Sequence, residues 1–144
     1  MDASLKVLIA DDHPLMLHGI RRALEGSEGI EVVGEARSGE EVLALVERRN
    51  PDLVLLDLHM PGICGIECIT KLRAGYPDVK AVVISASNDR ASIDAALLAG
   101  ASAYILKSVS PVDIPSVLRQ AATGKRTRSS SHASLYALLQ ISAS

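Results

Sequence analysis

Short apolar runs alternate with longer amphipathic stretches along the chain. The apolar runs are rich in Val, Ile and Leu, with little strict alternation of polar residues, and they lie at 6–10, 30–36, 52–58, 79–85 and 102–107. Such runs are typical of strands buried on both faces, as in a parallel sheet covered by helices. The second run contains more polar residues, so we expect that strand at an edge of the sheet.

The amphipathic stretches carry helix signals. Ser38 and Glu41 have the spacing of a capping box, and Gly100 suits the end of a helix. Ser110 suits a helix start, but Pro115 removes a nearby backbone donor, so this last helix is expected to begin later. Five strands and five helices in strict alternation predict an α/β fold with a parallel sheet and right-handed crossovers.

Composition narrows the class of protein. The chain has 144 residues, 48% of them apolar, without Phe or Trp, so we expect one domain with an aliphatic core. A net charge of −2 does not indicate a nucleic-acid-binding surface. The N-terminus lacks the pattern of a signal peptide, and the apolar runs are too short to span a membrane.

The two cysteines, Cys64 and Cys68, favour a reduced, cytoplasmic protein. With no third ligand at suitable spacing, a packing role around a helix start is preferred to a zinc site. After Gly124 the sequence becomes basic and Ser-rich, like a linker, and a short apolar run follows. We therefore expect a compact domain over 1–124 and a linker or tail over 125–144.

Polar residues follow four of the predicted strands. Asp11 and Asp12 follow the first strand, Asp57 ends the third, Ser85 the fourth and Lys107 the fifth. Because the carboxyl ends of parallel strands lie along one edge, where open α/β sheets bind ligands, we expect these side chains to converge.

Three carboxylates in one pocket raise each other's pKa unless a cation neutralises them. Oxygen donors without His or Cys favour Mg²⁺ (or Mn²⁺) over zinc. The histidines show no triad or metal spacing and are left without a role: His13, His18, His59 and His132.

A carboxylate such as Asp57 is ionised near neutral pH and can act as a nucleophile toward phosphorus. Lys107 and a metal ion would neutralise the phosphoryl oxygens, and Ser85 would donate a hydrogen bond. Each residue also has an ordinary structural explanation. Asp12 could cap a helix, and Asp57 could belong to a turn. It is their shared position at one edge that favours phosphoryl chemistry.

Four segments together resemble the receiver domain of bacterial response regulators, over about residues 5–124. They are "IADDHP", "LVLLDLHMPGICGIE", "VVISAS" and "GASAYILKS". The opening "ADDHPLMLHGIRRAL" resembles the NarL/FixJ (LuxR-like) subfamily in particular. The resemblance implies a doubly wound, flavodoxin-like (βα)₅ fold with strand order 2-1-3-4-5.

The resemblance also implies roles at the metal and acceptor positions. Asp57 would accept the phosphoryl group. Asp11 and Asp12 would hold Mg²⁺ together with Asp57, with Asp12 as the more direct ligand, and the backbone carbonyl of His59 would be a further ligand.

Three further residues match family positions that respond to phosphorylation. Ser85 and Lys107 would contact the phosphoryl group, and Tyr104 would be the aromatic switch residue. The implied partners are a sensor histidine kinase and a second copy of the chain upon phosphorylation. DNA would be reached only through a helix-turn-helix effector domain, which 125–144 is too short to form.

Two other functions remain open on the sequence. A metal-dependent phosphohydrolase could use Asp57 covalently, but such enzymes have a D-x-D pattern after the first strand, whereas "DLH" here follows the third. A stand-alone receiver or pseudo-receiver could act only through protein–protein contacts, although no member of the phosphorylation set is missing. The expected function is a phosphorylation switch rather than an enzyme with turnover.

Overall fold

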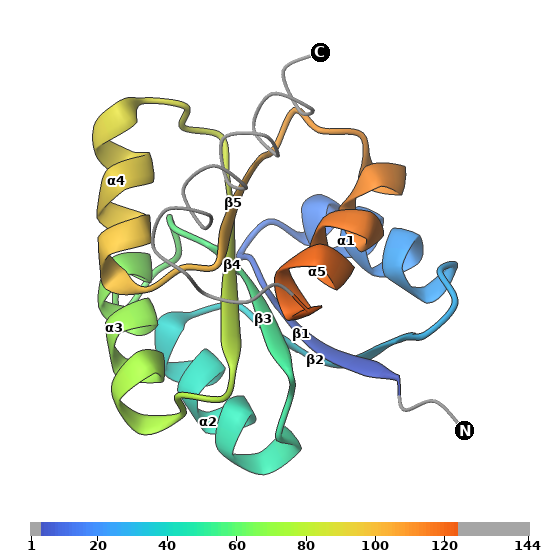
Figure 1. Ribbon diagram of the computed structural model, residues 1–144, viewed down its shortest axis with the longest axis horizontal. Helices are drawn as coiled ribbons and strands as arrows, with labels where there is room; N and C mark the ends of the chain where they lie inside the picture. The colour runs from blue at the N-terminus through green and yellow to red at the C-terminus, as the bar shows by residue number, and fades with distance from the viewer. Residues whose placement is uncertain (1–3, 124–144) are drawn as a thin grey trace.

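The computed structural model describes residues 4–123, and a parallel sheet runs through its centre (Figure 1). The five strands are β1 (Leu5–Ala10), β2 (Ile30–Ala36), β3 (Leu53–Asp57), β4 (Lys80–Ser85) and β5 (Ala103–Leu106). Their order in the sheet is β2-β1-β3-β4-β5, and all pairs are parallel. The predicted fold is confirmed, and β2 lies at an edge as expected.

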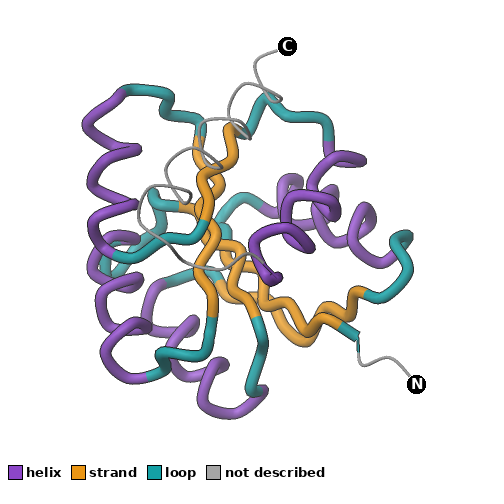
Figure 2. Tube along the Cα trace, viewed as in Figure 1, coloured by secondary structure: helices purple, strands orange, loops and turns teal. Residues whose placement is uncertain are grey.

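Helices cover both faces of the sheet (Figure 2). They are α1 (Pro14–Glu25), α2 (Gly39–Arg49), α3 (Gly65–Gly75), α4 (Arg90–Ala99) and α5 (Ile114–Thr123), with a 3₁₀ turn, η1 (Pro111–Asp113), before α5. Figure 1 shows α1 and α5 on one side of the sheet and α2, α3 and α4 on the other. The molecule is therefore a three-layer sandwich in which all the strands end at the same edge.

Alternate residues of each strand fill two separate cores. In β1, Val7 and Ile9 pack toward α1 and α5, whereas Leu8 and Ala10 pack toward α2 and α3. Period-2 burial on both faces explains why the strands read as continuous apolar runs. Without Phe or Trp, both cores consist mostly of aliphatic side chains, and Tyr104 is the large aromatic side chain that is fully buried.

Two helix starts refine the sequence predictions. The Ser38 hydroxyl caps α2 by accepting from the Glu41 N–H, but the Glu41 carboxylate accepts from the Arg37 N–H at 2.6 Å instead of closing the box on Ser38. The last α-helix begins at Ile114, after the 3₁₀ turn. Pro115 therefore lies at its second position, where a missing N–H costs little.

The start of α3 packs closely against the first residue after β3. The Gly65 N–H donates to the Leu58 carbonyl at 3.2 Å, and a Cβ on Gly65 would lie only 2.6 Å from Leu58 Cα. Only glycine permits this approach. The short loop that follows Asp57 is thus fixed at both ends.

The cysteines lie at the start of α3. Cys64 precedes the helix and is exposed, whereas Cys68 is buried in the core, where burial raises the pKa of its thiol to about 11. Cys68 therefore has the expected packing role. The predicted division at residue 124 stays a prediction, because 124–144 lie outside the described residues.

Candidate functional site

The carboxyl ends of β1, β3 and β5 bring three predicted site residues into contact. Lys107 Nζ lies 3.0 Å from Asp57 Oδ2 and 3.2 Å from Asp11 Oδ2. Both carboxylates are buried, with Asp57 only 1% exposed. Residues separated by up to 96 positions thus meet because parallel strands share one edge, as predicted.

Asp57 is held by the loop that it begins. Its Oδ1 accepts from the His59 N–H at 3.1 Å, and its Oδ2 accepts from Lys107. Burial raises the pKa of the Asp57 carboxyl, the bonds from His59 and Lys107 lower it, and the charge of Asp11 raises it, with a net upward direction. Ionisation of Asp57 in this buried position therefore lowers the stability of the folded protein.

Lys107 is the neutralising cation of this group. Burial lowers its pKa, but the hydrogen bond and charge of Asp57, together with the charge of Asp11, outweigh that effect and raise it. Lys107 therefore stays charged across the physiological range, beside the oxygen of Asp57 that a phosphoryl group would approach.

His13, for which the sequence predicted no role, also lies in this cluster. Its Nδ1 lies 3.0 Å from Asp11 Oδ1, 3.2 Å from Asp12 Oδ1 and 3.9 Å from Asp57 Oδ2. His13 was overlooked because it follows Asp12 directly and shows no metal-ligand spacing in sequence. The signal that could have found it is "DDHP", with three polar residues in a row after a buried strand.

The same geometry excludes the capping explanation of Asp12. The N-cap of α1 is His13, without a side-chain cap bond, and Asp11 Oδ1 accepts from the His13 N–H at 2.9 Å. Asp12 is instead free to present its carboxylate to the cluster, one third exposed.

The cluster has the donor atoms of a cation site. Asp11, Asp12, His13 and Asp57 each offer one ligand atom, and these atoms lie within 4.8 Å of one another. Within the described part of the chain, Asp11 Oδ2 and Asp12 Oδ1 are buried and accept no hydrogen bond. Lys107 Nζ lies 3.2 Å from Asp11 Oδ2, and His13 Nδ1 lies 3.2 Å from Asp12 Oδ1, so a divalent cation would add charge compensation to contacts that are already ionic in character. The site is therefore able to bind a metal ion.

Ser85 lies on β4, next to the strand that ends in Asp57, and Tyr104 lies on β5, one strand further. Ser85 ends β4, is buried, and accepts from the Ser87 N–H at 3.1 Å. The Tyr104 ring lies inside the core, and its hydroxyl donates to the Ser87 carbonyl at 2.7 Å. Burial raises the pKa of the Tyr104 phenol, so it stays a donor. The Ser85–Ser87 segment thus connects the two predicted switch residues.

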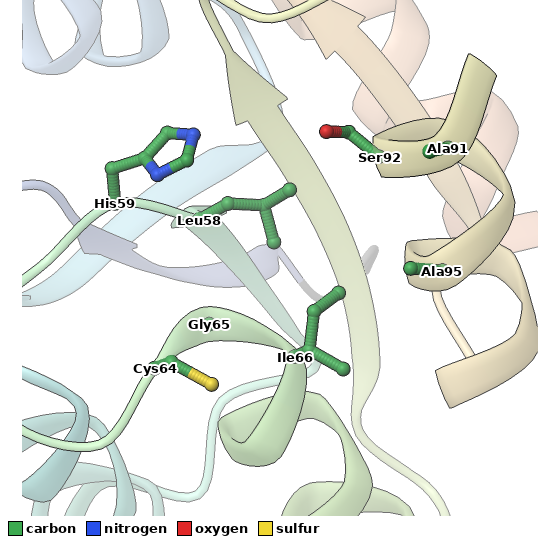
Figure 3. Close-up of a pocket in the computed structure, with 8 residues that line it drawn as sticks. All are labelled: Leu58, His59, Cys64, Gly65, Ile66, Ala91, Ser92 and Ala95. Atoms are coloured by element: carbon green, nitrogen blue, oxygen red, sulfur yellow. The ribbon is translucent and has the colours of Figure 1, made fainter. Parts of the chain in front are cut away.

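A hollow of about 330 Å³ opens beside the acceptor loop (Figure 3). Figure 3 shows the ring of His59 and the hydroxyl of Ser92 extending toward each other from opposite sides, with Leu58 between them. Because Leu58 and His59 follow Asp57 directly, this hollow lies between the loop after β3 and α4.

Comparison with known proteins identifies the family of this chain. The family model of the response regulator receiver domain matches residues 7–119. The chain belongs to this family. The family supports a phospho-accepting switch, and the alternative of an interaction-only module is not favoured.

The chain is similar in sequence to a response regulator of Escherichia coli. The nitrate/nitrite response regulator protein NarL of Escherichia coli is 42% identical over 119 residues, which cover 83% of this chain and 55% of NarL. The chain thus spans about half the length of such a relative.

Solved structures agree with the receiver fold. The signal receiver domain of the response regulator NarL from Mycobacterium tuberculosis is 34% identical, with a TM-score of 0.83 over 86% of this chain and all of that one. The isolated receiver of RcsB from Salmonella enterica, solved with phosphomimetic BeF₃⁻, is 31% identical, with a TM-score of 0.80 over 94% and 99%. Another structure shows RcsB dimers bound to DNA. No helix of the receiver within residues 4–123 is long and apolar enough to cross a membrane.

Proposed function

We propose that the receiver accepts one phosphoryl group on Asp57, in a reaction that depends on Mg²⁺. The observation that carries this proposal is the buried Asp57 carboxylate, paired with Lys107 at 3.0 Å and surrounded by further carboxylates at the sheet edge. A buried carboxylate with a raised pKa is costly to keep, and such costs concentrate at functional sites.

The transfer needs no general base. An ionised oxygen of Asp57 forms a bond to phosphorus while the bond from phosphorus to the donor breaks, and the donor leaves with that electron pair. The donor would be a phosphohistidine of a sensor kinase or a small acyl phosphate. Lys107 neutralises charge on the phosphoryl oxygens, and the Ser85 hydroxyl, which accepts from the Ser87 N–H, donates its own hydrogen to one of them.

Asp11, Asp12 and Asp57 would hold the Mg²⁺, with Asp12 as the more direct ligand and the His59 carbonyl as a further one. The donor set fits the ion, because Mg²⁺ takes carboxylate and carbonyl oxygens and keeps several waters. When bound, it supplies positive charge at the phosphoryl oxygens.

The wider role follows from the family. We propose that a sensor histidine kinase is the phosphoryl source in the cytoplasm, that phosphorylation favours a homodimer, and that DNA is reached through an effector domain outside these residues. RcsB, a relative in structure, forms dimers on DNA. The receiver is a switch with at most slow self-dephosphorylation, not an enzyme with substrate turnover.

The test is intact mass spectrometry of the full chain after incubation with acetyl phosphate. The wild type should gain a single phosphoryl group only when Mg²⁺ is present, Asp57→Asn should gain none, and Asp78→Asn, which changes an exposed acid on another loop, should behave as the wild type. A phosphoryl group on Asp57→Asn would refute the acceptor assignment. A wild type that gains none with Mg²⁺ would favour an interaction-only module.

A further inference from the structure

The imidazole of His13 lies inside the carboxylate cluster although its side chain is 64% exposed. Its Nδ1 is 3.0 Å from Asp11 Oδ1 and 3.2 Å from Asp12 Oδ1. The third carboxylate, Asp57, has its Oδ2 at 3.9 Å. One nitrogen therefore faces the same space as three carboxylate oxygens.

Two of these three spacings are those of neighbouring ligands in one coordination sphere. In an octahedral site with metal–ligand lengths of about 2.1 Å, neighbouring ligand atoms are about 3.0 Å apart and opposite ones about 4.2 Å apart. The distances from Nδ1 to Asp11 and Asp12 are those of neighbours, and the distance to Asp57 lies between the two limits. A single ion could thus contact the nitrogen and the oxygens together.

The backbone holds the imidazole in this position. His13 precedes Pro14, which restricts it to extended conformations, and its φ of −100° and ψ of 111° are of that kind. Its N–H also donates to Asp11 Oδ1 at 2.9 Å. The Cα of His13 is therefore fixed beside the cluster, so metal binding would restrict few additional rotatable bonds.

An independent observation indicates that the negative charge of the cluster is only partly compensated. Asp11 is fully buried, yet its Oδ2 accepts no hydrogen bond from any described residue, and the same holds for Asp12 Oδ1. Lys107 supplies one charge, at 3.2 Å from Asp11 Oδ2, against three carboxylates. Buried carboxylate oxygens without a partner are costly, and a divalent ion would relieve that cost.

We propose that His13 Nδ1 is a direct metal ligand, which gives this receiver a preference for borderline transition-metal ions such as Co²⁺ and Ni²⁺ over Mg²⁺. Imidazole nitrogen suits these ions, whereas Mg²⁺ keeps to oxygen ligands. A neutral imidazole can carry its proton on Nε2 and leave the Nδ1 lone pair for a metal ion. This inference rests on the proposed function, because that function supplies the cation site.

The first measurement is calorimetric titration of the full, unphosphorylated chain with Co²⁺ alone and with Mg²⁺ alone. His13→Ala and His13→Gln should weaken Co²⁺ binding by about tenfold or more and Mg²⁺ binding by much less. The matched control is His18→Ala, an exposed histidine on α1 that should change neither affinity.

The second measurement is pulsed EPR of bound Mn²⁺, which detects a directly coordinated ¹⁴N. The nitrogen coupling should be present in the wild type and in His18→Ala and absent in both His13 variants. Equal Co²⁺-to-Mg²⁺ preference in wild type and His13 variants, or no nitrogen coupling in the wild type, would overturn the ligand assignment while leaving the Mg²⁺ site intact. A wild type that binds none of these ions would instead refute the cation site of the proposed function.

Discussion

Asp57 is the residue at which function and stability oppose each other. Ionisation of a carboxyl that is 1% exposed and close to Asp11 destabilises the folded state, because burial and the charge of Asp11 raise its pKa. Lys107 offsets only part of this destabilisation, because its single positive charge is shared by two carboxylates.

Replacement of Asp57 by Asn should therefore stabilise the metal-free protein. We expect the free energy of unfolding at pH 7 to rise by roughly 1 kcal/mol, measured by urea denaturation without divalent ions. A raised folded-state pKa means that the wild type loses stability as pH rises above the unfolded value of 3.8. The difference between the proteins should therefore shrink as pH falls toward 3.8.

Added Mg²⁺ should stabilise the wild type more than Asp57→Asn, because it neutralises the charge that the variant lacks. Asp78→Asn, with an exposed carboxyl, should leave the stability nearly unchanged. A less stable Asp57→Asn at neutral pH would show that the ion pair with Lys107 outweighs the cost of burial.

At the scale of elements, β4 and β5 connect the acceptor to the surface. Ser85 accepts from the Ser87 N–H, and Tyr104 donates to the Ser87 carbonyl, so both bonds end on one residue. If the Ser85 hydroxyl is drawn toward a phosphoryl oxygen, the Ser87 segment bonded to it is expected to shift, and the space open to the Tyr104 ring changes. A buried ring with a polar tip has a second resting place at the surface.

Phosphorylation should accordingly change amide NMR shifts over β4, α4 and β5, and not only near Asp57. In Tyr104→Phe, which lacks the hydroxyl bond, the unphosphorylated protein should already show part of these shifts. Changes restricted to residues around Asp57 in the wild type would contradict the switch.

At the scale of the molecule, we predict that this chain does not read DNA sequence alone. Its net charge is −2, and the basic segment 125–128 offers three cations, so contacts with phosphates should be weak and salt-sensitive. Titration at two salt concentrations, with a promoter fragment and a scrambled one, should show equal and salt-dependent binding. A sequence preference that survives physiological salt would contradict this prediction.

The strands and their order could be predicted because burial on both faces leaves a strong apolar signal. Asp11, Asp57 and Lys107 could be placed together because the strand ends fix them. The position of His13 could not, since it depends on how the chain turns between β1 and α1. The inward rotamer of Tyr104 could not be predicted either, because the sequence is compatible with a ring in the core and with a ring at the surface.

The most direct test of the central claim is chemical identification of the phosphorylated residue. After reaction with acetyl phosphate and Mg²⁺, borohydride reduction converts an aspartyl phosphate to homoserine, which peptide mass spectrometry locates. The predicted result is homoserine at position 57 alone, and only in the sample that received both donor and Mg²⁺. Homoserine at Asp11 or Asp12, or an intact Asp57 in a chain that has gained a phosphoryl group, would contradict the account.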